Sequence, residues 1–288
     1  MVGDTVPSMV HQVDARWTMA YAAALGDTHP CYFDTTSPEG VVAHPLFSVC
    51  PEWPVIVSSR SAGDKWGIAP QESRQSVHAV HDVVVHRLAR PGDELTTSLA
   101  YVGVEKKRPG AFVTLRLETV DQHGNPVATT EQGGMYLGVD TTGDDRPATP
   151  TTPAPQLPAA SETPIEVVSV PIAQGAAHTY TESARIWNPI HTDAQVAKDA
   201  GLPGIILHGT ATLALGVSKV LNLVTDGDPR RVRRISCRFG AMVLMPSTVQ
   251  VRLLGRHNLA DGTEAIQFDV RNEAGGPAVD VGVVILAP

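Results

Sequence analysis

The feature that most constrains this chain is the repetition of one order of motifs in its two halves. Each half has an alanine-rich segment that favours a helix, at residues 14–25 and 173–185, and Asp14 is placed to cap the first. A short turn with a proline follows, and then a histidine, His44 or His208, leads into a longer apolar stretch. The order predicts two copies of one small fold.

Eight segments rich in Val, Thr and Leu predict β-strands, four in each half, separated by turns with Gly, Pro, Asn or Asp. They lie at residues 76–88, 94–104, 111–121, 127–139, 233–244, 248–257, 264–272 and 278–286. One helix followed by an antiparallel sheet, repeated, is the layout of the hot-dog fold. Two such units can pair edge to edge and so close an open sheet edge. We therefore predict an α+β double hot-dog.

Residues 141–164 interrupt this pattern, because they are rich in Pro, Thr and Ala and lack apolar periodicity. Their prolines favour an extended course over the surface. We predict a linker here, between a first repeat at residues 1–140 and a second repeat at residues 165–288. Two fused repeats can act as a pseudo-dimer, so both a monomer and a homodimer of such chains are open.

The two halves differ in the central helix that each repeat requires. Residues 210–223 are an uninterrupted helical segment, whereas residues 46–59 contain Pro51 and Pro54. A proline inside a helix removes a hydrogen bond and costs about 3 kcal/mol. The central helix of the first half must therefore be short, kinked or displaced, which opens space for a pocket.

The second half also carries a dense motif. It consists of Asn188-Pro189-Ile190-His191, then Asp193, Ala197, Gly201 and Leu207-His208-Gly209. This motif resembles that of the MaoC-like R-specific enoyl-CoA hydratases, in which G-D-x-N-P-I-H is followed by a spacer of small residues and by H-G at the start of the central helix. The resemblance covers nearly the whole chain at the level of the fold, and its specific part is residues 188–209.

The resemblance implies a hydro-lyase that adds water to, or removes it from, the double bond of an enoyl thioester. His191 would be the main acid or base, since imidazole titrates near neutral pH. Asn188 would orient the water or His191, and the backbone N–H of Gly209 would stabilise the charge that develops on the thioester oxygen. Three neighbours are expected to contact the substrate: Trp187, Ile190 and His208.

One position departs from the family pattern. In the family an aspartate acts with the histidine on the water, and here Ile186 occupies the aspartate position. The first half shows the opposite loss, because Asp27 matches the aspartate but Tyr32 replaces the histidine. Asp27 is either a catalytic residue or a turn residue, since acidic residues commonly follow glycine in turns.

Three functions are therefore open. The first is a hydratase or dehydratase in which His191 works with Asn188, water and another acid. The second keeps the thioester pocket with a changed reaction, and the third is a non-catalytic acyl-CoA binding protein or the silent subunit of a heteromeric hydratase. We expect the first, acting on a bulky, branched or dicarboxylic acyl group carried by coenzyme A or acyl carrier protein, with no further cofactor.

Composition argues against several other classes of protein. A net charge of -8 disfavours a broad nucleic-acid surface. The most apolar stretch, residues 204–224, contains His208 and Lys219 and fits a buried helix better than a membrane span. Three widely spaced cysteines and a first segment unlike a signal peptide lead us to expect a reduced, cytoplasmic protein.

Two further polar clusters have simple interpretations. Strand alternation would place His78 and His86 on one face and His81 on the other, and no carboxylate or cysteine completes a metal site. Arg231 and Arg233 belong to an arginine cluster at the entry to a strand. This cluster is either a solvated loop or a contact to the phosphates of coenzyme A, which guanidinium groups bind well.

Overall fold

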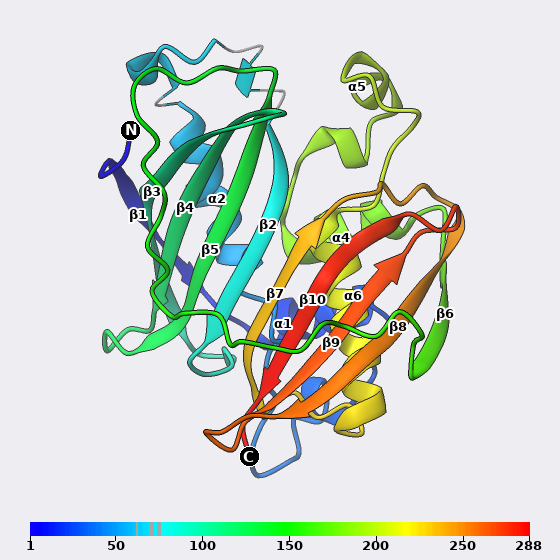
Figure 1. Cartoon of the computed structure of the whole chain (residues 1–288). Helices are drawn as coiled ribbons and strands as arrows, with labels where there is room; N and C mark the ends of the chain where they lie inside the picture. The colour runs from blue at the N-terminus through cyan, green and yellow to red at the C-terminus, as the bar shows by residue number, and fades with distance from the viewer. Residues whose placement is uncertain (62, 70–71, 74–75) are drawn as a thin grey trace.

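The computed structural model describes residues 1–61, 63–69, 72–73 and 76–288. Its strands form one ten-stranded sheet in the order β1-β3-β4-β5-β2-β7-β10-β9-β8-β6 (Figure 1). Neighbouring strands pair antiparallel throughout. Each half of the chain supplies five adjacent strands, so the predicted α+β fold of two side-by-side repeats is confirmed.

All eight predicted strands are present, and two more were missed. The strands are β1 Thr5–Gln12, β2 Ser76–Val85, β3 Glu94–Lys107, β4 Gly110–Val120, β5 Pro126–Leu137, β6 Glu166–Ile172, β7 Val232–Phe239, β8 Ser247–Asn258, β9 Glu264–Arg271 and β10 Pro277–Leu286. The missed strands, β1 and β6, lie at the two edges of the sheet. Each contains a proline, which edge strands tolerate but which weakens the sequence signal for a strand.

The helices lie together on one face of the sheet (Figure 1). They are α1 Ala15–Ala24, α2 Val49–Arg60, α4 Ala176–Ala184, α5 Ala194–Asp199 and α6 Gly209–Val224, with short 3-10 turns η1 Pro30–Tyr32, η2 Gly63–Trp66 and η3 Pro189–His191. Asp14 caps α1 as predicted, since its carboxylate accepts the Trp17 N–H at 2.7 Å. None of the helices in the described residues is long and apolar enough to cross a bilayer.

The two central helices are unequal, as the prolines predicted. α6 has 16 residues, is largely buried and packs on β8, β9 and β10. α2 has 12 residues, contains Pro54, and packs instead on β1 and β3. Near the pseudo-symmetry axis α1 packs on α4, and the Tyr21 and Tyr180 hydroxyls lie 3.2 Å apart.

Residues 138–165 cross the outer face of the sheet as an extended strap (Figure 1). Side chains of the sheet hold its carbonyl groups: Arg116 Nη2 donates to Thr149 O at 2.6 Å, and Gln267 Nε2 donates to Pro158 O at 2.9 Å. The proline-rich segment therefore takes the surface course that its composition predicted, and it is tied to both halves.

The two repeats join where β2 pairs with β7. There the Arg234 guanidinium makes two hydrogen bonds to the Asp82 carboxylate, at 2.8 and 2.6 Å, and a third to Pro153 O at 2.7 Å. Arg234 is buried, and a bidentate pair of this kind fixes orientation as well as distance. The pair therefore links the first repeat, the second repeat and the strap.

Candidate active site

The turn η3 positions His191, the residue singled out by the motif. Its Nδ1 lies 2.8 Å from the carbonyl oxygen of Ile206, which can only accept, so Nδ1 carries the proton and donates. That bond fixes the tautomer and leaves Nε2 with a free lone pair. No hydrogen bond to Nε2 is made by the described residues, and His191 lines a cavity. The ring is therefore held as a base.

The ring of His208 stacks on that of His191, with centroids 3.7 Å apart and an interplanar angle of 24°. Its Nε2 lies 3.2 Å from Thr181 Oγ1, which holds the ring in place. Burial lowers the pKa of His191 to about 4. Burial, and then the charge of a protonated His191, lowers the pKa of His208 well below its ordinary value. Both rings are thus neutral at pH 7, and His191 is free to accept a proton.

Gly209 begins α6 beside these rings. The first hydrogen bond of the helix runs from Thr212 N to His208 O at 3.0 Å, so the Gly209 N–H is one of the unpaired donors of the first turn. A Cβ added at Gly209 would lie 3.1 Å from the Phe239 ring, so Phe239 packs directly against this backbone. The N–H is a fixed donor at a helix N-terminus, suited to a developing oxyanion.

A cavity of about 320 Å³ brings the motif residues together. Its lining includes five of the predicted residues, namely Asn188, Ile190, His191, His208 and Gly209, and also Ile186. Ile186 is buried, so an apolar side chain does stand in the wall at the family's aspartate position. Beyond Phe239 the cavity continues into the first repeat, where α2, β2 and β5 supply the lining. The site is therefore shared by both halves of the chain.

Asp27 lies outside this cavity, which corrects the prediction that it could serve the His191 site. It is buried, and its carboxylate accepts the His29 N–H at 3.3 Å, as expected of a turn residue. Tyr32 is also buried, and its hydroxyl has no partner in the described part of the chain. The hollow beside His44 measures only about 10 Å³, too little for a substrate. His44, which matches His208 in the second half, therefore borders only this small hollow.

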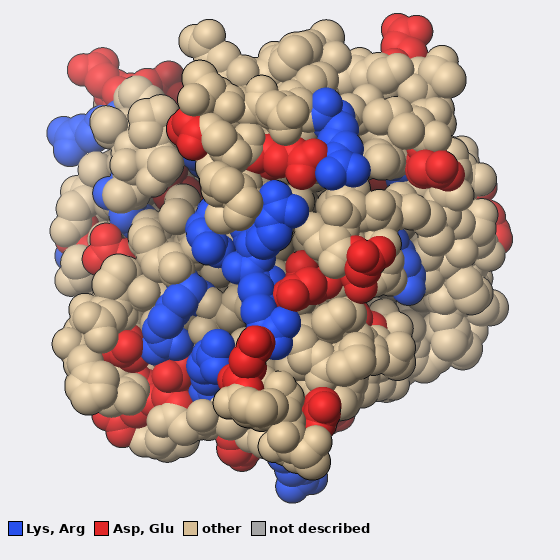
Figure 2. Space-filling view, turned by 90° about the horizontal axis from the view of Figure 1, so that it is seen from below, with Lys and Arg blue, Asp and Glu red and all other residues tan. Residues whose placement is uncertain are grey.

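Arg231 and Arg233 do not line the cavity either. Arg231 directly precedes β7 and Arg233 is its second residue, whereas the cavity meets β7 at Phe239, about 20 Å along the strand from Arg233. Arg231 Nε donates to Ala287 O at 2.7 Å, close to the C-terminus at the lower end of Figure 1. Figure 2 shows this end, where a band of Lys and Arg is interleaved with Asp and Glu. The solvated interpretation fits this arrangement, and the predicted phosphate contact lacks support.

Trp187 is 60% exposed and is not among the lining residues, so its predicted substrate contact remains a prediction. The alternation predicted for the β2 histidines holds for His81, which is buried, and His86, which is exposed, but it is wrong for His78. The pairing of β2 with β5 shifts between His78 and Val80, and this bulge brings the His78 and His81 rings within 5.4 Å of each other. Both line the cavity, and His86 is exposed.

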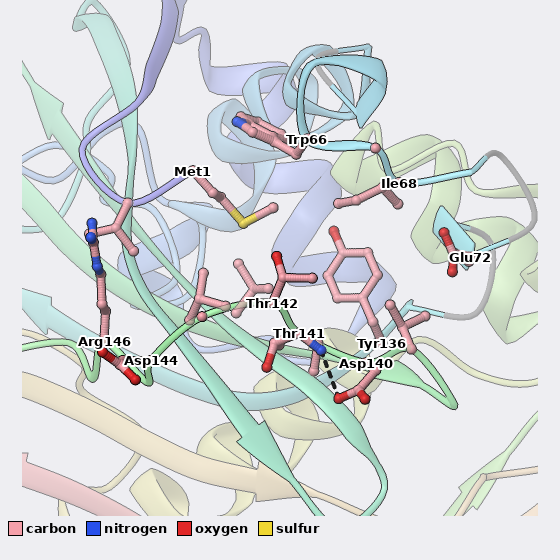
Figure 3. A pocket seen from close by; sticks show the side chains of 17 residues that line it. Met1, Trp66, Ile68, Glu72, Tyr136, Asp140, Thr141, Thr142, Asp144 and Arg146 are labelled. Atoms are coloured by element: carbon pink, nitrogen blue, oxygen red, sulfur yellow. Dashed lines mark hydrogen bonds between the residues drawn. The ribbon is translucent and has the colours of Figure 1, made fainter.

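A larger cavity of about 500 Å³ lies in the first repeat, lined by Met1, Trp66, Tyr136 and the start of the strap (Figure 3). It shares no lining residue with the His191 cavity and contains no histidine among the described residues. Size alone therefore does not identify the site. A fixed imidazole, a helix-terminal N–H and an amide converge on the smaller cavity, and the last two have no hydrogen-bond partner in the described part of the chain, which selects this cavity as the site.

Two family models match this chain. One described as MaoC like domain covers residues 156–275, and one described as FAS1-like, dehydratase domain region covers residues 1–130. Among curated proteins, the peroxisomal enoyl-CoA hydratase 2 of Arabidopsis thaliana is 41% identical over 63 residues, 22% of this chain and 20% of that protein. The peroxisomal multifunctional enzyme type 2 of Drosophila melanogaster is 28% identical over 170 residues, 59% of this chain and 28% of that protein. The chain thus spans less than a third of these relatives.

Solved structures agree on the fold. A MaoC-like dehydratase from Phytophthora capsici superposes with a TM-score of 0.79 at 20% identity, covering 98% of this chain and 95% of that one. A Mycobacterium tuberculosis protein described as having a double hotdog fold superposes with a TM-score of 0.62 at 16% identity, covering 99% and 95%. At such identities the likeness establishes the arrangement of the two repeats, and the chemistry rests on the residues in the cavity.

Proposed function

This chain is a MaoC-like protein of double hot-dog form, and from that premise we propose that it hydrates an enoyl thioester, or dehydrates the corresponding 3-hydroxyacyl thioester. The observation that carries the proposal is the fixed tautomer of His191. Its Nδ1–H is held by the Ile206 carbonyl, its Nε2 has no hydrogen-bond partner among the described residues, and both His191 and Gly209 line the cavity. A base and an oxyanion donor on one cavity wall suit addition to an activated double bond.

In the hydration direction, His191 Nε2 accepts a proton from water as the water oxygen forms a bond to C3. The carbon–carbon π bond opens toward C2, and the thioester becomes an enolate whose oxygen receives the Gly209 N–H. The imidazolium then returns its proton to C2, so one water is added and the enzyme is unchanged. Asn188 lines the cavity with an amide that makes no hydrogen bond within the described residues, and it can orient the water.

His191 acts here without the family's aspartate, because Ile186 takes that position. A single histidine can serve as base and then as acid on the same face of the double bond. Its low pKa of about 4 keeps it unprotonated at neutral pH and makes the imidazolium a strong acid toward C2. The same low pKa makes His191 a weak base for the first step, so we expect slow turnover relative to a site with an aspartate.

The apolar Ile186 also favours a second candidate, a non-catalytic acyl-CoA binding protein or the silent subunit of a heteromeric hydratase. Such a protein would keep the cavity and lose the water chemistry. A panel of trans-2-enoyl-CoA thioesters, followed by loss of enoyl absorbance and by binding, separates the two. Hydration of any member supports the enzyme, whereas tight binding of every member without hydration supports the binder.

For the acyl group, we propose a bulky chain on coenzyme A or acyl carrier protein. The support is the extension of the cavity under the short helix α2, beyond the space needed by the reacting carbons. The branched and dicarboxylic alternatives make different demands on the far end of the cavity. Varying the chain at a fixed thioester end, in the same absorbance assay, tests the size of the acyl group.

A further inference from the structure

The far end of the His191 cavity is polar, although a site for a plain hydrocarbon chain is expected to be apolar. There α2 contributes Glu52, β2 contributes His78 and His81, and β5 contributes Gln132. Glu52 and His81 are 1% and 0% exposed, so both side chains are almost entirely shielded from bulk water. These four residues are termed the distal polar cluster. None of them belongs to the motif that carries the proposed chemistry.

Glu52 is only partly satisfied. Thr130 on β5 donates its hydroxyl to Glu52 Oε1 at 2.5 Å, and the Ser48 hydroxyl lies near enough to stabilise the ionised carboxyl as well. Burial raises the pKa of Glu52 to about 7. The carboxyl is therefore protonated in a large share of molecules at neutral pH, and it can either donate or accept a hydrogen bond toward the cavity.

His81 has no hydrogen-bond partner at either ring nitrogen in the described residues. It lies opposite Gln132 in the β2–β5 register, and Val83, two residues along β2, lies opposite Thr130, the partner of Glu52. Positions two apart on a strand face the same side, so His81 and Gln132 point to the same side as Glu52. Burial lowers the pKa of His81 to about 3, so its ring is neutral. Buried donors and acceptors without partners destabilise a fold unless a ligand satisfies them.

On the premise of the proposed hydratase function, we propose that the distal polar cluster binds a neutral oxygen substituent, a hydroxyl or keto group, on the acyl chain of the substrate. Its distance from the reacting carbons follows from the sheet. Phe239 on β7 lies beside Gly209, β2 is the next strand and β5 the one after it, and the His78 ring begins the cluster 4.7 Å from the Phe239 ring. One to two strand spacings are roughly 5–10 Å, so the oxygen lies several carbons from the thioester.

The charges of the cluster disfavour a dicarboxylic substrate. A second carboxylate would face Glu52 and find neutral imidazoles at His78 and His81, whose pKa values burial lowers to about 4 and about 3. Arg60 also lines the cavity, but its guanidinium lies over the Trp53 ring, 5.0 Å from the centroid, at the exposed end of α2. A neutral oxygen can pair with Glu52 and His81 without desolvating a charge.

The test measures affinity for saturated thioesters, which the enzyme cannot hydrate. Dissociation constants are compared for decanoyl-CoA, for decanoyl-CoA molecules with a single hydroxyl at successive carbons from C5 to C10, and for decanedioyl-CoA. Wild type is expected to bind one hydroxylated isomer about 10-fold to 100-fold more tightly than decanoyl-CoA. Glu52→Leu, of similar volume, should abolish that preference, and Glu52→Gln should retain part of it. Glu118→Gln, on the exposed face of β4, is the matched control and should change nothing.

Three outcomes would each overturn the inference. They are equal affinity for all chains, tightest binding of decanedioyl-CoA, and a hydroxyl preference that is unchanged in Glu52→Leu. If Glu52→Leu does not fold, the test uses His81→Phe and Glu52→Gln, each of which should weaken the preference for the hydroxylated isomer; an unchanged preference in both would overturn the inference. The test is separate from that of the hydratase. If the protein prefers the hydroxylated chain but hydrates no enoyl thioester, only the proposed hydratase function is contradicted. If it hydrates enoyl thioesters normally but shows no such preference, only the proposed distal site is contradicted.

Discussion

Replacing Glu52 by glutamine is expected to stabilise the protein at neutral and alkaline pH. Burial raises the pKa of Glu52 from 4.5 to about 7, so the folded protein holds this proton more tightly than the unfolded chain does. The contribution of this bound proton to the free energy of unfolding is fully present below pH 4.5 and is lost as the pH rises to 7. The difference between the pKa of Glu52 in the unfolded chain and in the folded protein corresponds to about 3 kcal/mol of unfolding free energy. Glutamine has no proton to lose and can still pair with Thr130.

Urea unfolding of wild type and Glu52→Gln, followed by tryptophan fluorescence from pH 4.5 to 8.5, measures this difference. The other buried titrating groups, including His78 and His81, are common to both proteins and largely cancel. The variant should match wild type near pH 4.5 and exceed it by about 3 kcal/mol above pH 7.5, or roughly 5–10 °C in melting temperature. Glu118→Gln, whose carboxyl is exposed, should follow wild type at every pH.

Parallel stability curves for wild type and Glu52→Gln across this range would refute the reasoning. They would mean that the Glu52 carboxyl ionises at its ordinary pH, and hence that the far end of the cavity is well solvated. A variant that is less stable than wild type above pH 7 would show that ionised Glu52 has a partner in the folded protein.

Three further predictions concern the site and the junction of the repeats. The acid limb of the kcat/KM profile should lie near pH 4, because burial lowers the pKa of His191 to about 4; an acid limb near 6.5 would contradict the buried site. Gly209→Ala should lower turnover at least about tenfold, since the Cβ of the alanine would press on the Phe239 ring. The double variant Gly209→Ala/Phe239→Leu should recover part of the lost turnover. Equal loss in the single and the double variant would argue against this contact. Arg234→Met should reduce stability by about 2 kcal/mol in urea unfolding, because it leaves Asp82 unpaired. Arg238→Met, at an exposed pair with Asp280, is its control and should change stability little.

The repeat predicted the fold well, because apolar periodicity and turn residues are properties of local sequence. The eight internal strands and both central helices follow from such patterns. The edge strands β1 and β6 did not, since each is short, largely exposed and interrupted by a proline. Edge strands are stabilised by their single neighbour, and that pairing leaves little trace in their own composition.

The site was predictable only where it is local in sequence. Asn188, His191 and Gly209 meet because the turn η3 and the start of α6 are close along the chain. Glu52 and His81 were missed because they reach the cavity from the other repeat. The far end of the cavity depends on a bulge in β2 at residues 78–80 and on the course of α2. Strand alternation in the sequence reveals neither of them.

The same reasoning explains the predictions that failed. Arg231 and Arg233 are close in sequence to the strand that borders the cavity, but a strand separates its two ends by its full length. Asp27 matched a family position by sequence, yet it is buried in a turn of the first half and does not line the His191 cavity. The expected cytoplasmic location remains a prediction, and the relatives include proteins named as peroxisomal.

The most direct test of the proposed hydratase is the hydration rate of a trans-2-enoyl-CoA by wild type and by His191→Ala, with thioester affinity and melting temperature measured on both. The account predicts that kcat/KM falls at least about 100-fold in His191→Ala, while affinity for a saturated thioester and the fold are retained. His86→Ala, at an exposed histidine, should leave the rate unchanged. Hydration that persists in His191→Ala at the rate of wild type would contradict the central claim.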